Sequence, residues 1–205
     1  MAGAQYKSGD KKGYLATTTR LIKVDASPAR WKVLLTNFQQ NNMRSEAKLA
    51  LYHLMLTTGA LDRPADYQDF ARLALLNGQA AIAKLALDKT GGGTDAMSKK
   101  LAAAAAAGVA NEGPEAMKLA AAPATAFKGG NAWLGLGEYA RAIAAYDKAI
   151  AANGLDADYA RVFKGVAAVK GGQKAAAIAT FKAVGDKSGM KDIADLWSLY
   201  ASSRG

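Results

Sequence analysis

The chain contains one histidine, His53, and no cysteine. Histidine is the side chain that most often moves protons or binds metals near neutral pH, but a single imidazole cannot assemble a zinc site without further His or Cys ligands. A Ser-His-Asp triad would also have to use His53, and no GxSxG sequence accompanies it. We therefore expect a structural or surface role for His53, with no catalytic residue and no metal site.

A glycine-rich run at residues 91–94, Gly-Gly-Gly-Thr, followed by Lys99 and Lys100, contains some residue types of a phosphate-binding loop. The Gly-Lys-Ser/Thr core of such a loop is missing, and no β-strand is predicted before the glycines. This stretch is predicted to be the end of a helix, and no cofactor is expected.

Two pairs of carboxylates are close in the sequence: Asp62 with Asp66, and Asp156 with Asp158. Both pairs fall between predicted helices, where aspartate commonly accepts hydrogen bonds from the first amides of a helix. Nothing nearby indicates the raised pKa that a general acid needs. We expect these residues to be helix caps.

The charge of the chain limits its partners. The formal net charge is +10, and residues 1–32 carry +5 of it. A basic chain can bind nucleic acid, an anionic membrane surface or an acidic protein. Basic and aromatic residues mostly fall on different helix faces, so we disfavour nucleic acid.

No run of 18 apolar residues is present, so no transmembrane segment is predicted.

Three segments resemble one another, at 78–89, 137–148 and 172–183. Each begins with glycine, places alanine five residues later and places a bulky residue four residues after that. These positions are Ala83, Ala142 and Ala177, then Leu87, Tyr146 and Phe181. Ala47 and Leu51 make a fourth copy. The alanines are 36, 59 and 35 residues apart, so the long interval requires an insertion of about 24 residues.

The apolar periodicity predicts an all-α chain. We expect helices at 9–24, 28–40, 44–58, 64–76, 78–89, 95–109, 114–122, 124–136, 137–148, 158–170, 172–184 and 186–202. The organisation has N-terminal helix pairs at 1–90, a Gly/Ala-rich helical spacer at 91–122, and C-terminal pairs with a capping helix at 123–205. The side chains of the spacer are too small to pack deeply.

Some of these residues match the tetratricopeptide repeat (TPR). Trp31, Leu34 and Phe38 occupy first-helix positions of the motif, and Ala47 and Leu51 occupy second-helix positions. The order of residues at 50–92 and 193–203 is similar to the C-terminal part of long proteobacterial TPR proteins, many of which carry secretion leaders. The resemblance implies a right-handed α-solenoid and a periplasmic protein that lacks its leader or was cut from a longer chain; the cytoplasm is the alternative.

The resemblance also implies a concave groove lined by first helices. Eight residues are predicted to face this groove: Phe127, Lys128, Asn131, Leu134, Tyr159, Val162, Val166 and Lys170. The favoured function is a non-enzymatic scaffold that binds a protein or peptide there, and the net charge favours an acidic partner. The alternative is a small apolar ligand or lipid inside the superhelix. Exposed apolar faces are usually covered or used, so the chain could also fill this groove itself, with the spacer or with a missing N-terminal part.

Overall fold

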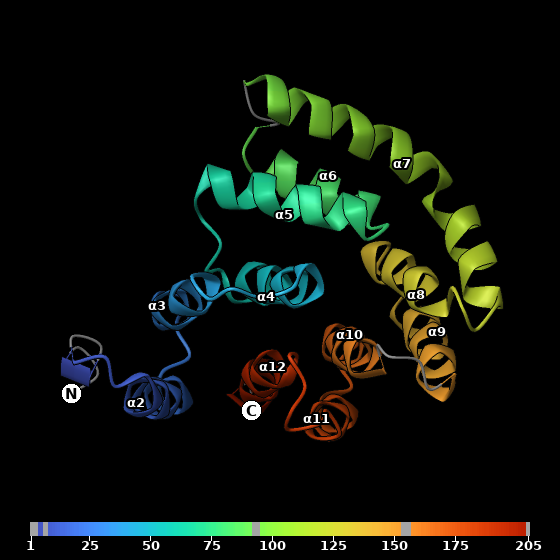
Figure 1. The fold of residues 1–205 in the computed structure, drawn as a ribbon. Coiled ribbons are helices and arrows are strands. Elements are labelled where there is room, and N and C mark those ends of the chain that lie inside the picture. Colours follow the sequence, from blue (N-terminus) through green and yellow to red (C-terminus); the bar gives the residue numbers. More distant parts are fainter. Residues whose placement is uncertain (1–3, 6–7, 92–94, 153–156, 204–205) are drawn as a thin grey trace.

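A computed structural model describes residues 4–5, 8–91, 95–152 and 157–203. Within these ranges the chain is all α-helical, and successive helices pack against one another (Figure 1). The helices are α2 (Lys11–Val24), α3 (Pro28–Gln39), α4 (Ser45–Thr58), α5 (Pro64–Leu76), α6 (Ala80–Asp88), α7 (Ala96–Ala121), α8 (Ala126–Gly135), α9 (Tyr139–Ala151), α10 (Ala157–Lys170), α11 (Lys174–Lys182) and α12 (Lys191–Ser203).

In three helix pairs the two helices are joined by the same kind of turn. Gly78, Gly137 and Gly172 join α5 to α6, α8 to α9 and α10 to α11, with φ angles of 73°, 77° and 78°. A residue with a Cβ rarely adopts this left-handed conformation, whereas glycine does so readily. The glycine that begins each sequence copy is therefore the turn of a helix pair, and the predicted helical repeat is confirmed at these three places.

The helices of a pair approach closely because the first helix lacks a side chain at the contact. A Cβ added at Gly165 would lie 2.2 Å from Cε1 of Phe181, and one added at Gly130 would lie 2.6 Å from Cε1 of Tyr146. In both pairs the aromatic residue follows the glycine by 16 positions. In these two copies the bulky residue thus packs directly on the backbone of the preceding helix.

Helix α4 lies at the centre of the molecule. All residues from Leu49 to Met55 are buried, and the helix packs against α3, α5, α10 and α12. A helix that is apolar around its whole circumference is buried on all sides. Ala47 and Leu51 of α4 follow the same sequence pattern as the alanine and bulky residues of α6, α9 and α11. The pattern therefore did not reveal that α4 lies at the centre.

The chain closes on itself through its last helix. The indole N–H of Trp197 on α12 donates a hydrogen bond to the Ala50 carbonyl on α4 at 3.0 Å. The rings of Trp31 and Tyr200 lie 5.9 Å apart in an edge-on contact. Figure 1 shows α12 beside α2 and α4, so the C-terminal helix returns to the N-terminal part of the stack. It begins at Lys191, after turns, and not at residue 186 as predicted.

The predicted spacer forms one helix instead of two. Helix α7 runs without a break through Pro114 and arches along the outside from α6 to α8 (Figure 1). Pro114 is exposed, whereas Glu112 and Ala116 beside it are buried. Packing on both sides of the proline therefore keeps the helix continuous, although proline usually interrupts one. The expectation that the spacer's small side chains do not pack deeply was wrong for Ala105 and Ala116, which are fully buried, although other alanines of the run at 101–107 are exposed.

Candidate functional site

The structure buries most of the residues that were predicted to line a groove. Asn131, Leu134, Tyr159, Val162 and Val166 are buried, Phe127 and Lys170 are partly exposed, and Lys128 is exposed. These residues belong to α8 and α10, and α10 packs directly against α4. Most of the predicted first-helix positions are therefore buried within the chain, and the chain's own central helix packs against those on α10.

Two of these buried residues have hydrogen bonds within the chain. Asn131 accepts a hydrogen bond from the Tyr146 hydroxyl at 2.8 Å, and the Tyr159 hydroxyl accepts one from Arg44 at 2.8 Å. The Arg44 guanidinium also lies 5.4 Å from the centre of the Tyr159 ring. Asn131 thus links α8 to α9, and Tyr159 links α10 to the start of α4.

His53 is fully buried, so of the structural and surface roles that the sequence left open, the surface role is excluded. Its Nε2 lies 2.8 Å from Oε1 of Gln79, and its ring meets the Phe70 ring edge-on at 5.2 Å. Burial and, to a lesser extent, the charge of Lys170 lower the pKa of His53 to about 3, against a smaller opposite effect of the hydrogen bond with Gln79. The imidazole is therefore neutral at physiological pH.

Glu112 reaches across from α7 to the first turn of α6. Its Oε2 accepts a hydrogen bond from the Ala81 amide at 2.7 Å, whereas the N-cap residue Gln79 makes no side-chain cap bond. A carboxylate satisfies the free amides at a helix N-terminus and interacts well with the helix dipole. Burial raises the pKa of Glu112 to about 6, although the Ala81 and Ala80 amides act in the opposite direction. Glu112 therefore caps α6 from a distant part of the chain.

Sequence reasoning did not select Glu112 or Gln79. Gln79 follows the turn glycine of its repeat copy, and Glu112 follows the alanine-rich run of the predicted spacer. The signal available in the sequence was Glu112 itself, an acidic residue that follows an alanine-rich run and has few polar neighbours in the sequence. Its partner, the α6 N-terminus, could be identified only from the packing of α7.

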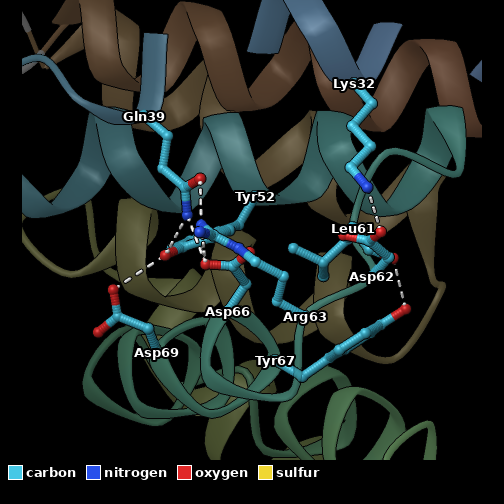
Figure 2. Close-up of polar contacts among 9 residues, drawn as sticks. All are labelled: Lys32, Gln39, Tyr52, Leu61, Asp62, Arg63, Asp66, Tyr67 and Asp69. Atoms are coloured by element: carbon cyan, nitrogen blue, oxygen red, sulfur yellow. Dashed lines mark hydrogen bonds and ion pairs between the residues drawn. The ribbon is translucent and has the colours of Figure 1, made fainter. Parts of the chain in front are cut away.

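A second polar cluster joins α3, α4 and α5 (Figure 2). Arg63 binds Asp66 with two hydrogen bonds, from Nε at 2.6 Å and from Nη2 at 2.8 Å. Gln39 donates to Asp66 at 2.7 Å and to the Tyr52 hydroxyl at 3.1 Å. Asp66 is 6% exposed, so this paired charge fixes α5 against α3. The prediction that Asp62 and Asp66 cap a helix was wrong, because both form ion pairs, Asp62 with Lys32.

Asp69 completes this cluster. Burial would raise its pKa, but hydrogen bonds from Lys48, Arg72 and Tyr52 lower it to about 2. Burial raises the pKa of the Tyr52 hydroxyl well above its usual value. Each of these groups has a fixed partner, so the cluster stabilises the helix packing and offers no free acid or base.

Three exposed lysines lie on the helices that adjoin the junction of α7 and α8, and we call Lys118, Lys128 and Lys148 the basic corner. A Cβ added at Gly129 would lie 2.4 Å from the Ala120 nitrogen, so the start of α8 touches the end of α7. The Lys148 ammonium donates to the carbonyls of Ala120 and Ala121 at 2.9 and 3.0 Å. Lys118 and Lys128 form no side-chain hydrogen bond or ion pair with any residue that the structure describes.

The remaining sequence candidates add no site. Residues 92–94 of the glycine run, and Asp156, lie outside the described residues. Asp158 binds Arg161 at 2.6 Å and accepts a hydrogen bond from the Gly185 amide at 3.3 Å. Among the described residues, no three His, Asp or Glu side chains are grouped so that they could hold a metal ion. No helix in the described ranges is long and apolar enough to cross a membrane.

No protein-family model, curated protein or solved structure matches this chain.

Proposed function

We propose that this chain is a non-enzymatic helical scaffold that binds an acidic segment of a protein partner at its basic corner. The helix pairs would be TPR-like units of a right-handed solenoid, in keeping with the shared glycine turns and the repeated glycine-aromatic contacts. The resemblance to leader-bearing proteins supports a periplasmic location.

The observation that carries this proposal is that ion pairs are distributed unevenly along the chain. Six ion pairs join basic residues between Arg30 and Lys84 to carboxylates: Arg30–Asp25, Lys32–Asp62, Lys48–Asp69, Arg63–Asp66, Arg72–Asp69 and Lys84–Asp88. At the basic corner, Lys118 and Lys128 have no such partner among the described residues. Exposed cations without internal partners attract an anionic surface and accelerate its association.

The location differs from the one that the sequence suggested. Of the eight predicted groove residues, Lys128 is the one whose side chain is exposed. The alternative function, an apolar ligand inside the superhelix, would require displacing the chain's own side chains, because Val162 and Val166 are fully buried. A partner therefore has easier access to the outer corner than to the interior.

The test is a binding titration with a labelled ten-residue polyglutamate peptide, followed by fluorescence anisotropy. We expect binding that weakens with added salt, because exposed charges are screened. The double variant Lys118→Glu, Lys128→Glu should bind at least about tenfold more weakly, which corresponds to about 1.4 kcal/mol.

The matched control is Lys174→Glu, Lys182→Glu, which makes the same charge change at exposed positions on α11. This control should bind about as well as the unmodified protein. Equal weakening of both double variants would mean that only net charge matters. That result, or an absence of binding to the peptide, would reject the corner as the binding site.

A further inference from the structure

The outward side of α2 combines exposed apolar side chains with exposed cations. Val24 is 88% exposed and Leu21 is 37% exposed, although both are large apolar residues. Arg20 and Lys23 are exposed on the same helix. Residues three or four positions apart share one side of a helix, so Arg20 adjoins both Lys23 and Val24, and Leu21 adjoins Val24. These four side chains form one continuous surface, which we call the α2 face.

No described helix covers the α2 face. Helix α2 packs against α3 and α12, and its buried residues Tyr14, Thr18 and Ile22 follow one another at four-residue spacing on the opposite side. Figure 1 shows α2 at the N-terminal end of the helix array. The residues before α2 contact its first half, where Gln5 accepts a hydrogen bond from the Thr17 hydroxyl at 2.9 Å. The outer side of its last two turns is exposed.

The cations of the α2 face have no partner within the described chain. Neither Arg20 nor Lys23 forms a hydrogen bond or ion pair with a described residue. The carboxylates at the two ends of α2 are engaged elsewhere: Asp10 accepts from a backbone amide of its own helix at 2.9 Å, and Asp25 pairs with Arg30 at 2.6 Å. A solvated helix face is polar and often carries charges of both signs. The α2 face carries only positive charge, so it is complementary to an anionic surface.

The shape of the α2 face favours a lipid surface over an acidic protein. The face is the convex side of a single helix, and a protein partner would need a pocket shaped to its two apolar side chains. A bilayer needs no such pocket. On a helix that lies at a membrane surface, apolar side chains enter the headgroup region while lysine and arginine interact with anionic lipids.

We propose that the α2 face binds the surface of an anionic lipid membrane, with α2 lying parallel to that surface. Leu21 and Val24 enter the headgroup region, and Arg20 and Lys23 pair with lipid phosphates. Binding is weak and reversible, because two apolar side chains and two cations contribute far less than a membrane-spanning helix does. The α2 face lies on a different helix from the three lysines of the basic corner, so its test does not depend on the function proposed above.

The test is co-sedimentation of the full chain with lipid vesicles. One set of vesicles contains equal parts of phosphatidylglycerol and phosphatidylcholine, and the other contains phosphatidylcholine alone. We expect binding to the anionic vesicles that weakens with added salt, and little binding to the neutral ones. The double variant Arg20→Gln, Lys23→Gln should bind the anionic vesicles at least about tenfold more weakly. Val24→Ser should weaken binding at least about twofold, because it removes apolar contact alone.

Matched controls make the same changes away from the α2 face. Lys174→Gln, Lys182→Gln removes two exposed cations from α11, and Leu76→Ser removes an apolar side chain that is 71% exposed on α5. Both controls should bind the anionic vesicles as well as the unmodified protein does. The proposal is overturned if the anionic vesicles do not bind, if the α11 control loses as much binding as the α2 double variant, or if Val24→Ser has no effect.

A titration with the ten-residue polyglutamate peptide separates a membrane from an acidic protein. The double variant Arg20→Gln, Lys23→Gln should bind this peptide as the unmodified protein does, because the basic corner is unchanged. Loss of peptide binding with unchanged vesicle binding would assign the α2 face to an acidic protein and overturn the proposal. If the peptide binds neither form, the function proposed above fails and the vesicle result alone decides this proposal.

Discussion

The indole of Trp197 is hydrogen-bonded to the carbonyl of Ala50, although 147 residues separate them in the sequence. This bond places the last helix against the centre of α4, and α4 in turn covers the inner face of α10. A repeat array of this length could have remained open, with a concave surface for a partner. Here the chain occupies that surface itself, and the proposed partner site lies on the outside.

The glycine-aromatic contacts of the repeats can be tested by adding one methyl group. Gly165→Ala should destabilise the protein by about 1–3 kcal/mol, because the new Cβ would overlap the Phe181 ring. Gly189→Ala is the control, since a Cβ there meets nothing within 4 Å and the φ angle of Gly189 is not in the left-handed region. It should change the free energy of unfolding by less than about 1 kcal/mol. Urea unfolding measures both changes, and equal effects would contradict the close approach.

The Asp69 cluster should contribute to stability in a pH-dependent way. The pKa of Asp69 is lowered from 3.8 to about 2, so its contribution is fully present above pH 3.8 and is lost as the pH falls through 2. Asp69→Asn should therefore lower the free energy of unfolding by about 2 kcal/mol at pH 7 and change it little near pH 2. Asp88→Asn, which breaks an exposed pair with Lys84, should cost less than about 0.5 kcal/mol. Chemical denaturation at both pH values compares them; equal costs at pH 7 would argue against a special role for Asp69.

Glu112 should show the opposite pH dependence. Its pKa is raised from 4.5 to about 6, so the folded state binds more protons than the unfolded state between these values. Its contribution to stability therefore falls as the pH rises through this window. As the pH rises from 4.5 to 7, the free energy of unfolding of Glu112→Gln should increase by about 1–2 kcal/mol relative to that of the unmodified protein.

This comparison isolates Glu112, because His53 is present in both proteins and its own titration cancels. Denaturation with urea at several pH values gives the stability difference. Glu115→Gln, an exposed neighbour on α7, should show no such pH-dependent difference. A flat difference for Glu112→Gln would mean that its pKa is not raised.

Most of the helices could be predicted from the sequence, because local signals define them. Pro64 begins α5, Gly78 and Gly137 end first helices, and Trp31 to Phe38 form an apolar stripe that is buried as expected. Proline misled the prediction at position 114, where packing of Glu112 and Ala116 overrides the local preference.

The site was harder to predict than the helices. Periodicity shows which face of a helix is apolar, but it does not show which other helix covers that face. Tyr159 and Val166 were therefore assigned to an open groove, although α4 from the N-terminal half lies against α10. The contact between Glu112 and the start of α6 depends on how α7 packs, and no sequence spacing encodes it.

The closure of the stack is the central claim, and a distance between two spin labels tests it most directly. The chain has no cysteine, so Val33→Cys and Ser202→Cys would place labels only at exposed positions on α3 and α12. Val33 and Ser202 each lie two residues along the chain from Trp31 and Tyr200, whose ring centroids are 5.9 Å apart. We expect one short, narrow distance distribution that does not change when the acidic peptide binds. A long or broad distribution would show an open array and would contradict it.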